Sequence, residues 1–217
     1  MGNRVVLTLV LASSNRGKLE ELRALLGGLP VEVRCARDVL GVEPDVEEDG
    51  ATFEANAEKK AREVCRATGT VAIADDSGLE VDALGGRPGV HSARFAGEHG
   101  RDEDNNQKLL AQLSAVSTVE RTARFRCVLA LASPWHPRVW LARGSCEGVI
   151  GSAPRGSRGF GYDPLFVPND APGRTMAELE PAEKNRISHR SRAAAELRPA
   201  VHELLRSILA RANRIAE

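Results

Sequence analysis

The sequence has no excess of either charge, no closely spaced cysteines and no hydrophobic run long enough to cross a bilayer. Its 30 basic and 30 acidic residues cancel, so no overall positive potential draws in duplex nucleic acid or an anionic membrane. Any anion-binding site must therefore be a local one.

The cysteines and the N-terminal apolar stretch exclude further classes. Cys35, Cys65, Cys127 and Cys146 form no CxxC pair and have no histidine-rich segment beside them, which favours buried free thiols in a reducing cytoplasm over a zinc site. Residues 5–12 are apolar but too short to span a bilayer, and they lack a signal-peptide layout. We therefore expect a cytoplasmic protein with a buried first strand and with no membrane or nucleic-acid partner.

The length and the apolar periodicity predict one folded domain. With 217 residues, 42% of them hydrophobic, the chain can bury a sizeable core in one domain or in two lobes of one domain. The spacing predicts helices over residues 18–26, 52–64 and 106–113, and strands over residues 71–74, 79–84, 122–132 and 139–142. The last two strands form a predicted β-hairpin, in which we interpret Trp135 and Trp140 as packing residues.

Two adjacent aspartates, Asp75 and Asp76, follow a short apolar strand and precede Ser77 and Gly78. A buried strand that ends at this point fixes the carboxylates, while a bend exposes their oxygens to a metal or a substrate. Because Asp and Ser are also ordinary turn residues, a plain solvated bend is the alternative.

A polar loop at residues 13–18 joins the first strand to a leucine-rich helix that ends near Gly27. Backbone N–H groups at the helix start, the positive end of its dipole and Lys18 together predict a cradle for a triphosphate. The glycine spacing is not that of a Walker loop, and a simple helix cap is the alternative.

A second acidic cluster, residues 47–49, stands just before the helix predicted from Thr52. Asn56 and Lys60 lie four positions apart beside the apolar stripe of that helix, so both side chains can point into one cleft. The alternative is an acidic helix N-terminus favoured by the dipole, with Lys60 in solvent.

Two segments in the second half of the chain suit a planar, charged ligand. Residues 160–164 combine Phe160 and an acid with glycines that allow close backbone approach. Lys184, His189 and Arg190 place cations in a helix or at a helix start, where they can bind phosphate or a base carbonyl. A tightly packed loop and a structural histidine are the alternatives.

In this order the motifs resemble the inosine/xanthosine triphosphate pyrophosphatases, the Ham1-like family of non-canonical purine NTP pyrophosphatases. The matching motifs span nearly the whole chain, at residues 13–18, 47–61, 74–79, 85–89, 92–94, 160–164 and 188–190. The resemblance implies an α/β fold in which an elongated, twisted mixed β-sheet with flanking helices forms two lobes around a nucleotide cleft. It also implies one domain over residues 1–217 and a homodimer.

The resemblance further implies roles for individual residues. Asp76 is the catalytic base and a metal ligand, and Glu48, alone or with Glu47, is the other metal-side carboxylate. The implied substrate-binding residues are Ser13, Ser14, Asn15, Arg16, Gly17, Lys18, Ser77, Phe160, Gly161, Tyr162, Asp163, Lys184, His189 and Arg190. Asn56, Lys60 and Asp75 are implied as supporting residues.

The chain departs from the family pattern at two positions. Ala55 stands where the family often has Glu, and Glu54 next to it points elsewhere on a helix. Any role of the usual acid is therefore missing at this position. Ser14 replaces a frequent glycine and requires a less permissive backbone conformation.

The implied reaction is hydrolysis of ITP, dITP and XTP to the monophosphate and pyrophosphate, which clears deaminated purines from the nucleotide pool. Mg²⁺ prefers oxygen ligands and usually combines one or two carboxylates with phosphates and waters, which fits Glu48, Asp76 and a triphosphate. Water attack at the α-phosphorus follows, with donors to the 6-oxo group rejecting ATP. A related enzyme for modified pyrimidines and a noncatalytic nucleotide sensor are the two alternatives.

Overall fold

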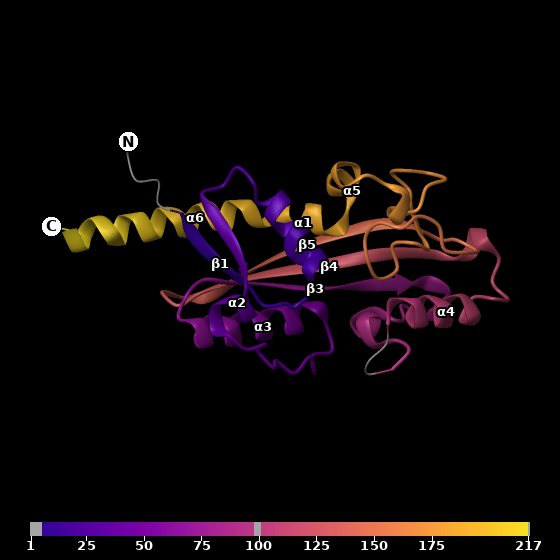
Figure 1. Ribbon diagram of the computed structural model, residues 1–217, viewed down its shortest axis with the longest axis horizontal. Coiled ribbons are helices and arrows are strands. Elements are labelled where there is room, and N and C mark those ends of the chain that lie inside the picture. The colour runs from indigo at the N-terminus through magenta and orange to yellow at the C-terminus, as the bar shows by residue number, and fades with distance from the viewer. Residues whose placement is uncertain (1–5, 98–100, 217) are drawn as a thin grey trace.

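The computed structural model describes residues 6–97 and 101–216, and its centre is a six-stranded mixed sheet (Figure 1). The strand order is β2-β1-β3-β4-β5-β6. The strands are β1 (Leu7–Leu11), β2 (Val31–Cys35), β3 (Ala72–Val81), β4 (Thr122–Ser133), β5 (His136–Ile150) and β6 (Phe166–Pro168). β1 pairs in parallel with β2 and β3, and all other pairings are antiparallel. The predicted mixed α/β sheet is confirmed.

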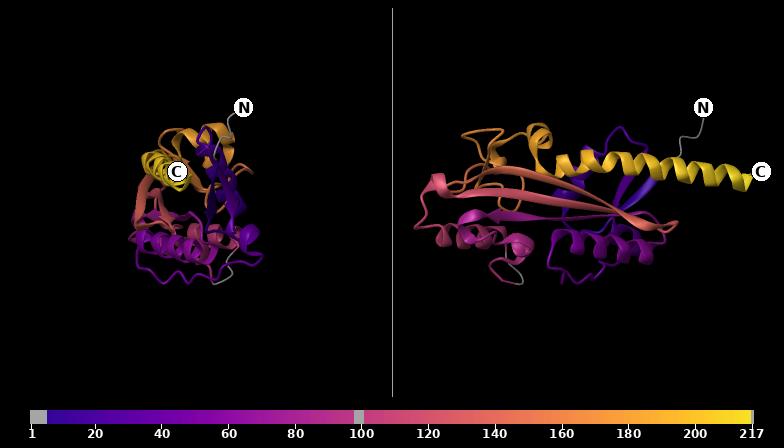
Figure 2. Two further views of the ribbon diagram at one scale, coloured as in Figure 1. Left: turned by 90° about the vertical axis from the view of Figure 1, so that its left-hand side faces the viewer. Right: turned by 180° about the vertical axis from the view of Figure 1, so that it is seen from behind.

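Helices cover both faces of the sheet (Figures 1 and 2). They are α1 (Arg16–Leu25), α2 (Ala36–Leu40), α3 (Phe53–Thr68), α4 (Asp102–Gln112), α5 (Pro181–Ile187) and α6 (His189–Ala216), with 3-10 turns η1 (Asp82–Leu84), η2 (Gly89–Arg94), η3 (Thr118–Glu120) and η4 (Met176–Glu178). The α1, α5 and α6 helices lie on one face, and α3 and α4 lie on the other. No helix in the described ranges is long and apolar enough to cross a membrane.

Successive side chains of β3 point to opposite faces of the sheet, and this explains how helices on both faces pack against the same strand. Ile73 packs with leucines of α1 and α6, whereas Ala72 and Ala74 pack against α3. Because successive strand residues point to opposite faces, small alanines on one side allow α3 to approach closely. Farther along, Leu79 and Val81 enter a third cluster with α4 and the segment between β5 and α5. The long strands β3, β4 and β5 therefore run from one lobe into the other.

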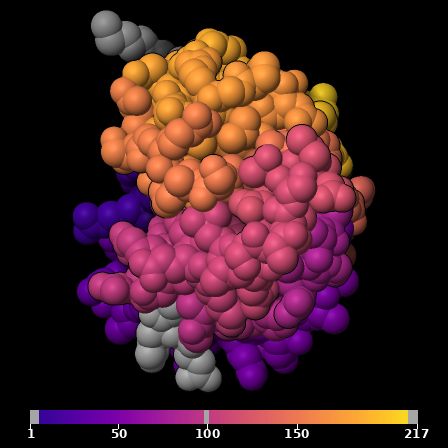
Figure 3. All heavy atoms as spheres, turned by 90° about the vertical axis from the view of Figure 1, so that its right-hand side faces the viewer, coloured from indigo at the N-terminus to yellow at the C-terminus, as the bar shows by residue number. Residues whose placement is uncertain are grey.

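The second lobe is built from two segments that meet across the end of the sheet (Figure 3). In that view the segment between β5 and α5, in orange, lies directly against the magenta segment that holds η2 and α4. The Gly161 peptide carries part of this contact, because its N–H donates to Asp102 at 2.6 Å and its C=O accepts from Asn106 Nδ2 at 2.9 Å. The two lobes of the expected fold are thus present.

The double aspartate lies in the middle of a strand, and the predicted bend at this point is wrong. β3 continues from Ala72 to Val81 because it pairs with β4 along its whole length, with Asp75 opposite Leu129 and Asp76 opposite Val128. Gly78 makes no turn here. A Cβ on Gly78 would lie 2.4 Å from Ser92 Oγ and 2.5 Å from Gly89 O, so this glycine permits close approach of η2.

Two other local predictions need adjustment, and a third, the helix or helix start at residues 184–190, is confirmed. Residues 79–84 form no separate strand, because β3 ends at Val81 and η1 follows. Ser188 separates α5 from α6 with extended backbone (ψ 155°), so the cations at 184–190 belong to two helices. Trp135 is 45% exposed because it lies in the turn beyond the Ser133–His136 pair, and its packing role is wrong, whereas Trp140 is buried as predicted.

Candidate functional site

Two hollows open between the lobes and share part of their lining. The first is lined by Ser13, Ser14, Glu48, Lys60 and Asp76, among others. The second is lined by aromatic and charged side chains that include Phe125, Phe160, Tyr162, Asp163, Lys184, His189 and Arg190. Asn15, Lys18, Ser77 and Ala93 line both hollows. An acidic compartment and an aromatic compartment are therefore continuous at Lys18 and Ser77.

The loop after β1 places Lys18 at this junction. Asn15 caps α1, with its side-chain oxygen accepting from Lys18 N at 3.0 Å, and Asn15 N donates to Ser13 Oγ at 3.2 Å. The cap alternative is thus correct as local structure, and it leaves the Lys18 ammonium directed at Asp75, with Nζ 2.7 Å from Oδ1. Arg16 lines neither hollow.

Gly17 also lines neither hollow, but it brings the first loop next to the aromatic compartment. A Cβ on Gly17 would lie 2.4 Å from Cδ1 of the Phe160 ring. Only a residue without a side chain permits the ring to approach the loop this closely. The residues predicted from the first and the second half of the chain are therefore in contact.

On the acidic side, Lys60 lies between Glu48 and Asp76. Lys60 Nζ donates to Glu48 Oε1 at 2.5 Å, to Asp76 Oδ1 at 2.8 Å and to the Asp75 carbonyl at 3.1 Å. Asn56, on the same helix, donates to Asp76 Oδ2 at 3.3 Å and accepts from Gly50 N at 2.8 Å. Both side chains therefore meet at Asp76, but of the two only Lys60 lines the hollow. Glu47 is exposed and lines neither hollow.

These neighbours set the charge states of the two acids. Burial raises the pKa of Asp76, and the Lys60 ammonium offsets this only in part. Burial also favours the neutral form of Glu48, but Lys60 together with Lys18 and Arg94 outweighs it, so the pKa of Glu48 is below its ordinary value. Asp76 is therefore the stronger base of the pair.

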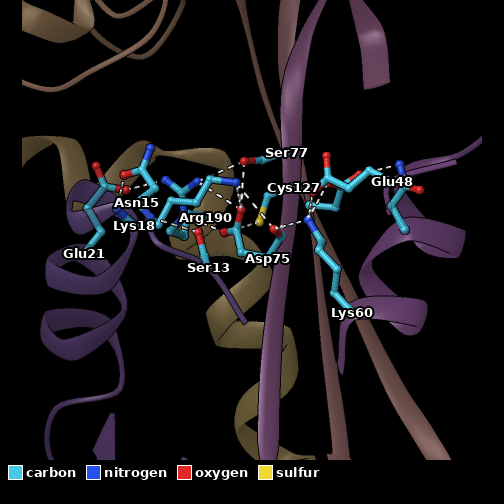
Figure 4. Close-up of polar contacts among 12 residues, drawn as sticks. Ser13, Asn15, Lys18, Glu21, Glu48, Lys60, Asp75, Ser77, Cys127 and Arg190 are labelled. Carbon is cyan, nitrogen blue, oxygen red and sulfur yellow. Dashed lines mark hydrogen bonds and ion pairs between the residues drawn. The ribbon is translucent and has the colours of Figure 1, made fainter. Parts of the chain in front are cut away.

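Asp75, on the opposite side of β3 from Asp76, holds together residues from distant parts of the chain (Figure 4). Its carboxylate is completely buried, lies 2.7 Å from both Lys18 Nζ and Arg190 Nε, and accepts from Ser77 Oγ at 2.8 Å and from Cys127 Sγ at 3.4 Å. Burial alone would raise its pKa, but Arg190 and Lys18 outweigh burial and hold the pKa of Asp75 well below the ordinary value.

Glu21 completes this network and was missed by the sequence interpretation. It lies on α1 one turn after Lys18, with Oε1 2.8 Å from Lys184 Nζ and Oε2 2.5 Å from Arg190 Nη1. Lys184 Nζ also lies 2.5 Å from Asp163 Oδ2. The spacing of Glu21 from Lys18 could have revealed it. Residues three apart share a helix face, so an acid on the Lys18 face of α1 would point into the same cleft.

The aromatic compartment is formed by Phe160 and by a buried imidazole. Lys184 Nζ and the Arg190 guanidinium lie 4.9 and 5.6 Å from the Phe160 ring centroid, within reach of cation–π attraction. The His189 ring stacks on Phe125 at 4.8 Å, and its Nδ1 has no hydrogen-bond partner among the described residues. Burial, together with Arg190 and Lys184, holds the pKa of His189 well below its ordinary value. The ring is therefore neutral at pH 7, with one donor and one acceptor nitrogen.

Five of the predicted site residues, Arg16, Gly17, Glu47, Asn56 and Asp75, line neither hollow, and the others line one continuous cleft. Residues that the sequence interpretation did not assign to the site also line or support it. They include Glu21, Ser92, Asp102, Asn105, Asn106 and Phe125. Tyr162, expected at the substrate, is buried and donates its hydroxyl to Ser92 O at 2.8 Å, so that hydroxyl joins the two halves of the second lobe.

The donor set suits Mg²⁺ bound together with phosphate. Glu48 and Asp76 provide two adjacent carboxylates, and no group of three or more His, Cys, Asp or Glu side chains in the described ranges could hold a metal alone. Mg²⁺ is commonly held by one or two carboxylates plus substrate phosphates and waters. The residues present therefore fit a metal that arrives with a polyphosphate.

Comparisons with known proteins agree with this geometry. The sequence profile of the Ham1 family matches residues 9–200. The chain is 53% identical over 190 residues to the dITP/XTP pyrophosphatase of Geobacter sulfurreducens, covering 88% of this chain and 94% of that protein. It is 52% identical over 203 residues to the Syntrophobacter fumaroxidans dITP/XTP pyrophosphatase, covering 94% and 85%. The solved Ham1 protein of Coxiella burnetii superposes with a TM-score of 0.79 at 44% identity, covering 91% of this chain and 100% of that one.

Proposed function

This chain belongs to the Ham1 family, and on that premise we propose that it hydrolyses the non-canonical purine triphosphates dITP, ITP and XTP to the monophosphate and pyrophosphate. The observation that carries the proposal is the continuity of the two hollows at Lys18 and Ser77. A triphosphate in the acidic compartment has its base within reach of Phe160. The relatives named dITP/XTP pyrophosphatase favour a purine substrate over a modified pyrimidine.

Asp76 is the proposed general base. It has the raised pKa of the acid pair, and Asn56 holds its Oδ2. From this position it orients a water and takes its proton as the water attacks the α-phosphorus. Lys18 and the N–H groups at the start of α1 stabilise the negative charge that moves onto the leaving pyrophosphate.

Glu48 and Asp76 are the proposed ligands of Mg²⁺, with Glu47 set aside because it points into neither hollow. The ion, when bound, supplies Lewis-acid stabilisation of phosphoryl charge. Ser13, Ser14 and Asn15 lie on the same side as the acids, where their polar groups can hold phosphate oxygens.

Base selection is assigned to the aromatic compartment. Phe160 offers a stacking surface, and the neutral His189 ring lines the same hollow. Arg190 is largely engaged by Asp75, Glu21 and Ser77, so its proposed role shifts from direct readout toward holding Phe160 and Asp75. A 6-oxo purine satisfies a donor here, whereas adenine presents its amino group, and an unpaired buried donor is costly.

We also propose that the chain acts as a single Ham1-like domain over residues 1–217, as a homodimer, and in the cytoplasm. The profile match over residues 9–200 supports the single domain. Cys65, Cys127 and Cys146 are buried free thiols, which suits a reducing compartment. Family resemblance supports the homodimer.

A substrate panel tests the proposed function. Purified protein is incubated with Mg²⁺ and with dITP, XTP, dGTP or dATP, and nucleotide products, pyrophosphate and orthophosphate are measured separately. We expect monophosphate and pyrophosphate from dITP and XTP at rates far above those with dATP. Tight binding of dITP without turnover would support the noncatalytic sensor and contradict the proposal.

A further inference from the structure

Lys60 lies between the two carboxylates that are the proposed metal ligands. Its ammonium donates to Glu48 Oε1, Asp76 Oδ1 and the Asp75 carbonyl at 2.5, 2.8 and 3.1 Å. A lysine ammonium has three donors, so all three are engaged, and each partner is an oxygen. The side chain is only 8% exposed. An internal cation therefore neutralises part of the charge of the acid pair.

The remaining oxygens of both acids are held by other donors. Asp76 Oδ2 accepts from Asn56, while the Glu48 backbone carbonyl accepts from Arg94 Nη2 at 3.0 Å and Arg94 Nη1 lies 3.6 Å from Glu48 Oε2. These contacts do not involve Lys60. Each acid therefore has a contact that does not depend on the ammonium, and the two oxygens that the ammonium would vacate both lie within 2.8 Å of its nitrogen.

The same hollow offers Lys60 a second partner. Its wall continues from Lys60 and Glu48 to Ser13, Ser14, Asn15 and Lys18, where the proposed triphosphate lies. The lysine stem is flexible and its charge is compact, so Lys60 can turn from the acids to phosphate oxygens within one hollow. A triphosphate thus supplies the anion that releases Lys60, while Mg²⁺ supplies the cation that replaces it.

We propose that Lys60 is an internal counter-ion that holds the metal position in the nucleotide-free protein, so that Mg²⁺ binds tightly only together with a triphosphate. This rests on the metal role of Glu48 and Asp76 in the proposed function. The Lys60 ammonium and Mg²⁺ compete for the same pair of carboxylates, and a bound triphosphate favours Mg²⁺ because it provides Lys60 with another anionic partner. Metal and nucleotide binding are then coupled, and by linkage each strengthens the other.

Metal titration of the nucleotide-free protein tests this coupling. Mn²⁺ serves as a paramagnetic probe for the Mg²⁺ site, and free Mn²⁺ is measured by electron paramagnetic resonance with wild type, Lys60→Met and Lys59→Met. Lys59 is the matched control, because it precedes Lys60 on α3 but pairs at the surface with Asp49, 2.8 Å away. We expect Lys60→Met to bind Mn²⁺ at least tenfold more tightly than the other two proteins. Adding Glu48→Gln to Lys60→Met should abolish the gain.

Equal Mn²⁺ affinity in wild type and Lys60→Met would overturn the proposal. If Lys60→Met fails to fold, ¹⁵N spectroscopy of the lysine ammonium groups in wild type tests whether the Lys60 ammonium leaves the acids. The Lys60 signal is assigned as the one that is missing from the spectrum of Lys60→Arg. The wild-type signal should be unchanged by Mg²⁺ alone and should shift when Mg²⁺ and a non-hydrolysable α,β-imido analogue of dITP are added together. A shift with Mg²⁺ alone would contradict the proposal.

Parallel turnover of dITP by wild type separates this inference from the proposed function. Turnover without a Lys60 effect on Mn²⁺ affinity means that only the counter-ion proposal fails. A tenfold Lys60 effect without turnover means that the counter-ion stands and the enzymatic assignment fails.

Discussion

Asp75 and Asp76 are neighbours in sequence, yet the structure gives them opposite surroundings. Asp75 is completely buried and contacts two cations, Lys18 and Arg190, while Asp76 contacts Lys60 and faces the acidic hollow. The sequence predicted that both acids belong to the site and named Asp76 as the base. It did not reveal the partner of either acid, because Arg190 lies 115 positions from Asp75 and no local pattern encodes such a contact.

Replacing Asp76 should reduce turnover more than substrate binding. Asp76→Asn keeps the shape of the side chain but removes the base and one metal charge, so we expect kcat to fall by a factor of about 10²–10⁴ with a smaller change in KM. Steady-state kinetics with dITP at saturating Mg²⁺ measures both constants. Asp82→Asn, at an exposed ion pair with Arg124, is the control, and near-normal kcat in Asp76→Asn would exclude Asp76 as the base.

Replacing Asp75 should instead destabilise the fold. Asp75→Asn leaves the buried Arg190 with Glu21 alone and the half-buried Lys18 without its carboxylate, and breaking a buried ion pair from one side costs about 3–5 kcal/mol. Urea denaturation should show this loss, whereas Asp82→Asn should change the free energy of unfolding by less than about 1 kcal/mol. An Asp75→Asn protein as stable as wild type would show that Lys18 and Arg190 find other partners.

His189 should contribute to the choice of base. His189→Phe keeps a ring on Phe125 but removes both nitrogens, so the lost hydrogen bond should lower the dITP-to-dATP ratio of kcat/KM by about 5-fold to 150-fold, as about 1–3 kcal/mol implies. Phe160→Ala should weaken both nucleotides alike, since stacking is largely indifferent to ring substituents. An unchanged ratio in His189→Phe would move base selection to backbone groups of residues 160–163.

At the scale of elements, periodicity predicted most helices and strands but not where they continue. The helix start at Phe53 with its Thr52 cap and the β4–β5 hairpin are confirmed. The predicted bend at Gly78 is wrong because glycine is common both in turns and at close approaches, and only the position of Ser92 distinguishes the two. Glu21 was missed for a similar reason, since its partners come from α5 and α6.

Gly78 should not tolerate a methyl group. In Gly78→Ala the new Cβ would meet Ser92 Oγ and the Gly89 carbonyl, and Ser92 Oγ also accepts from Leu79 N at 2.8 Å. Overpacking of this kind costs about 1–3 kcal/mol. Thermal denaturation should therefore give Gly78→Ala a lower melting temperature than wild type. Gly151→Ala is the control, because its Cβ would have only ordinary contacts at 3.4 Å or more, and its melting temperature should be close to that of wild type. Equal melting temperatures for all three would contradict the close packing of η2 on β3.

For the whole molecule, the cleft exists because three long strands carry both lobes. The polar loop after β1 and the acids before α3 lie in one lobe, and the aromatic compartment lies in the other, with β3 passing between them. The order of motifs predicted this architecture through family resemblance. The contacts that join the halves of the second lobe, such as Asp102 to the Gly161 peptide, depend on tertiary packing and had no sequence signal.

Hydrolysis of dITP in H₂¹⁸O tests the central claim most directly, because it shows which phosphorus the water attacks. Attack at the α-phosphorus, with Asp76 as base, places one ¹⁸O atom in the monophosphate and none in the pyrophosphate. Mass spectrometry of both products after a single turnover measures this. We predict label in the monophosphate alone; label in pyrophosphate, or release of orthophosphate with a nucleoside diphosphate, would contradict the account.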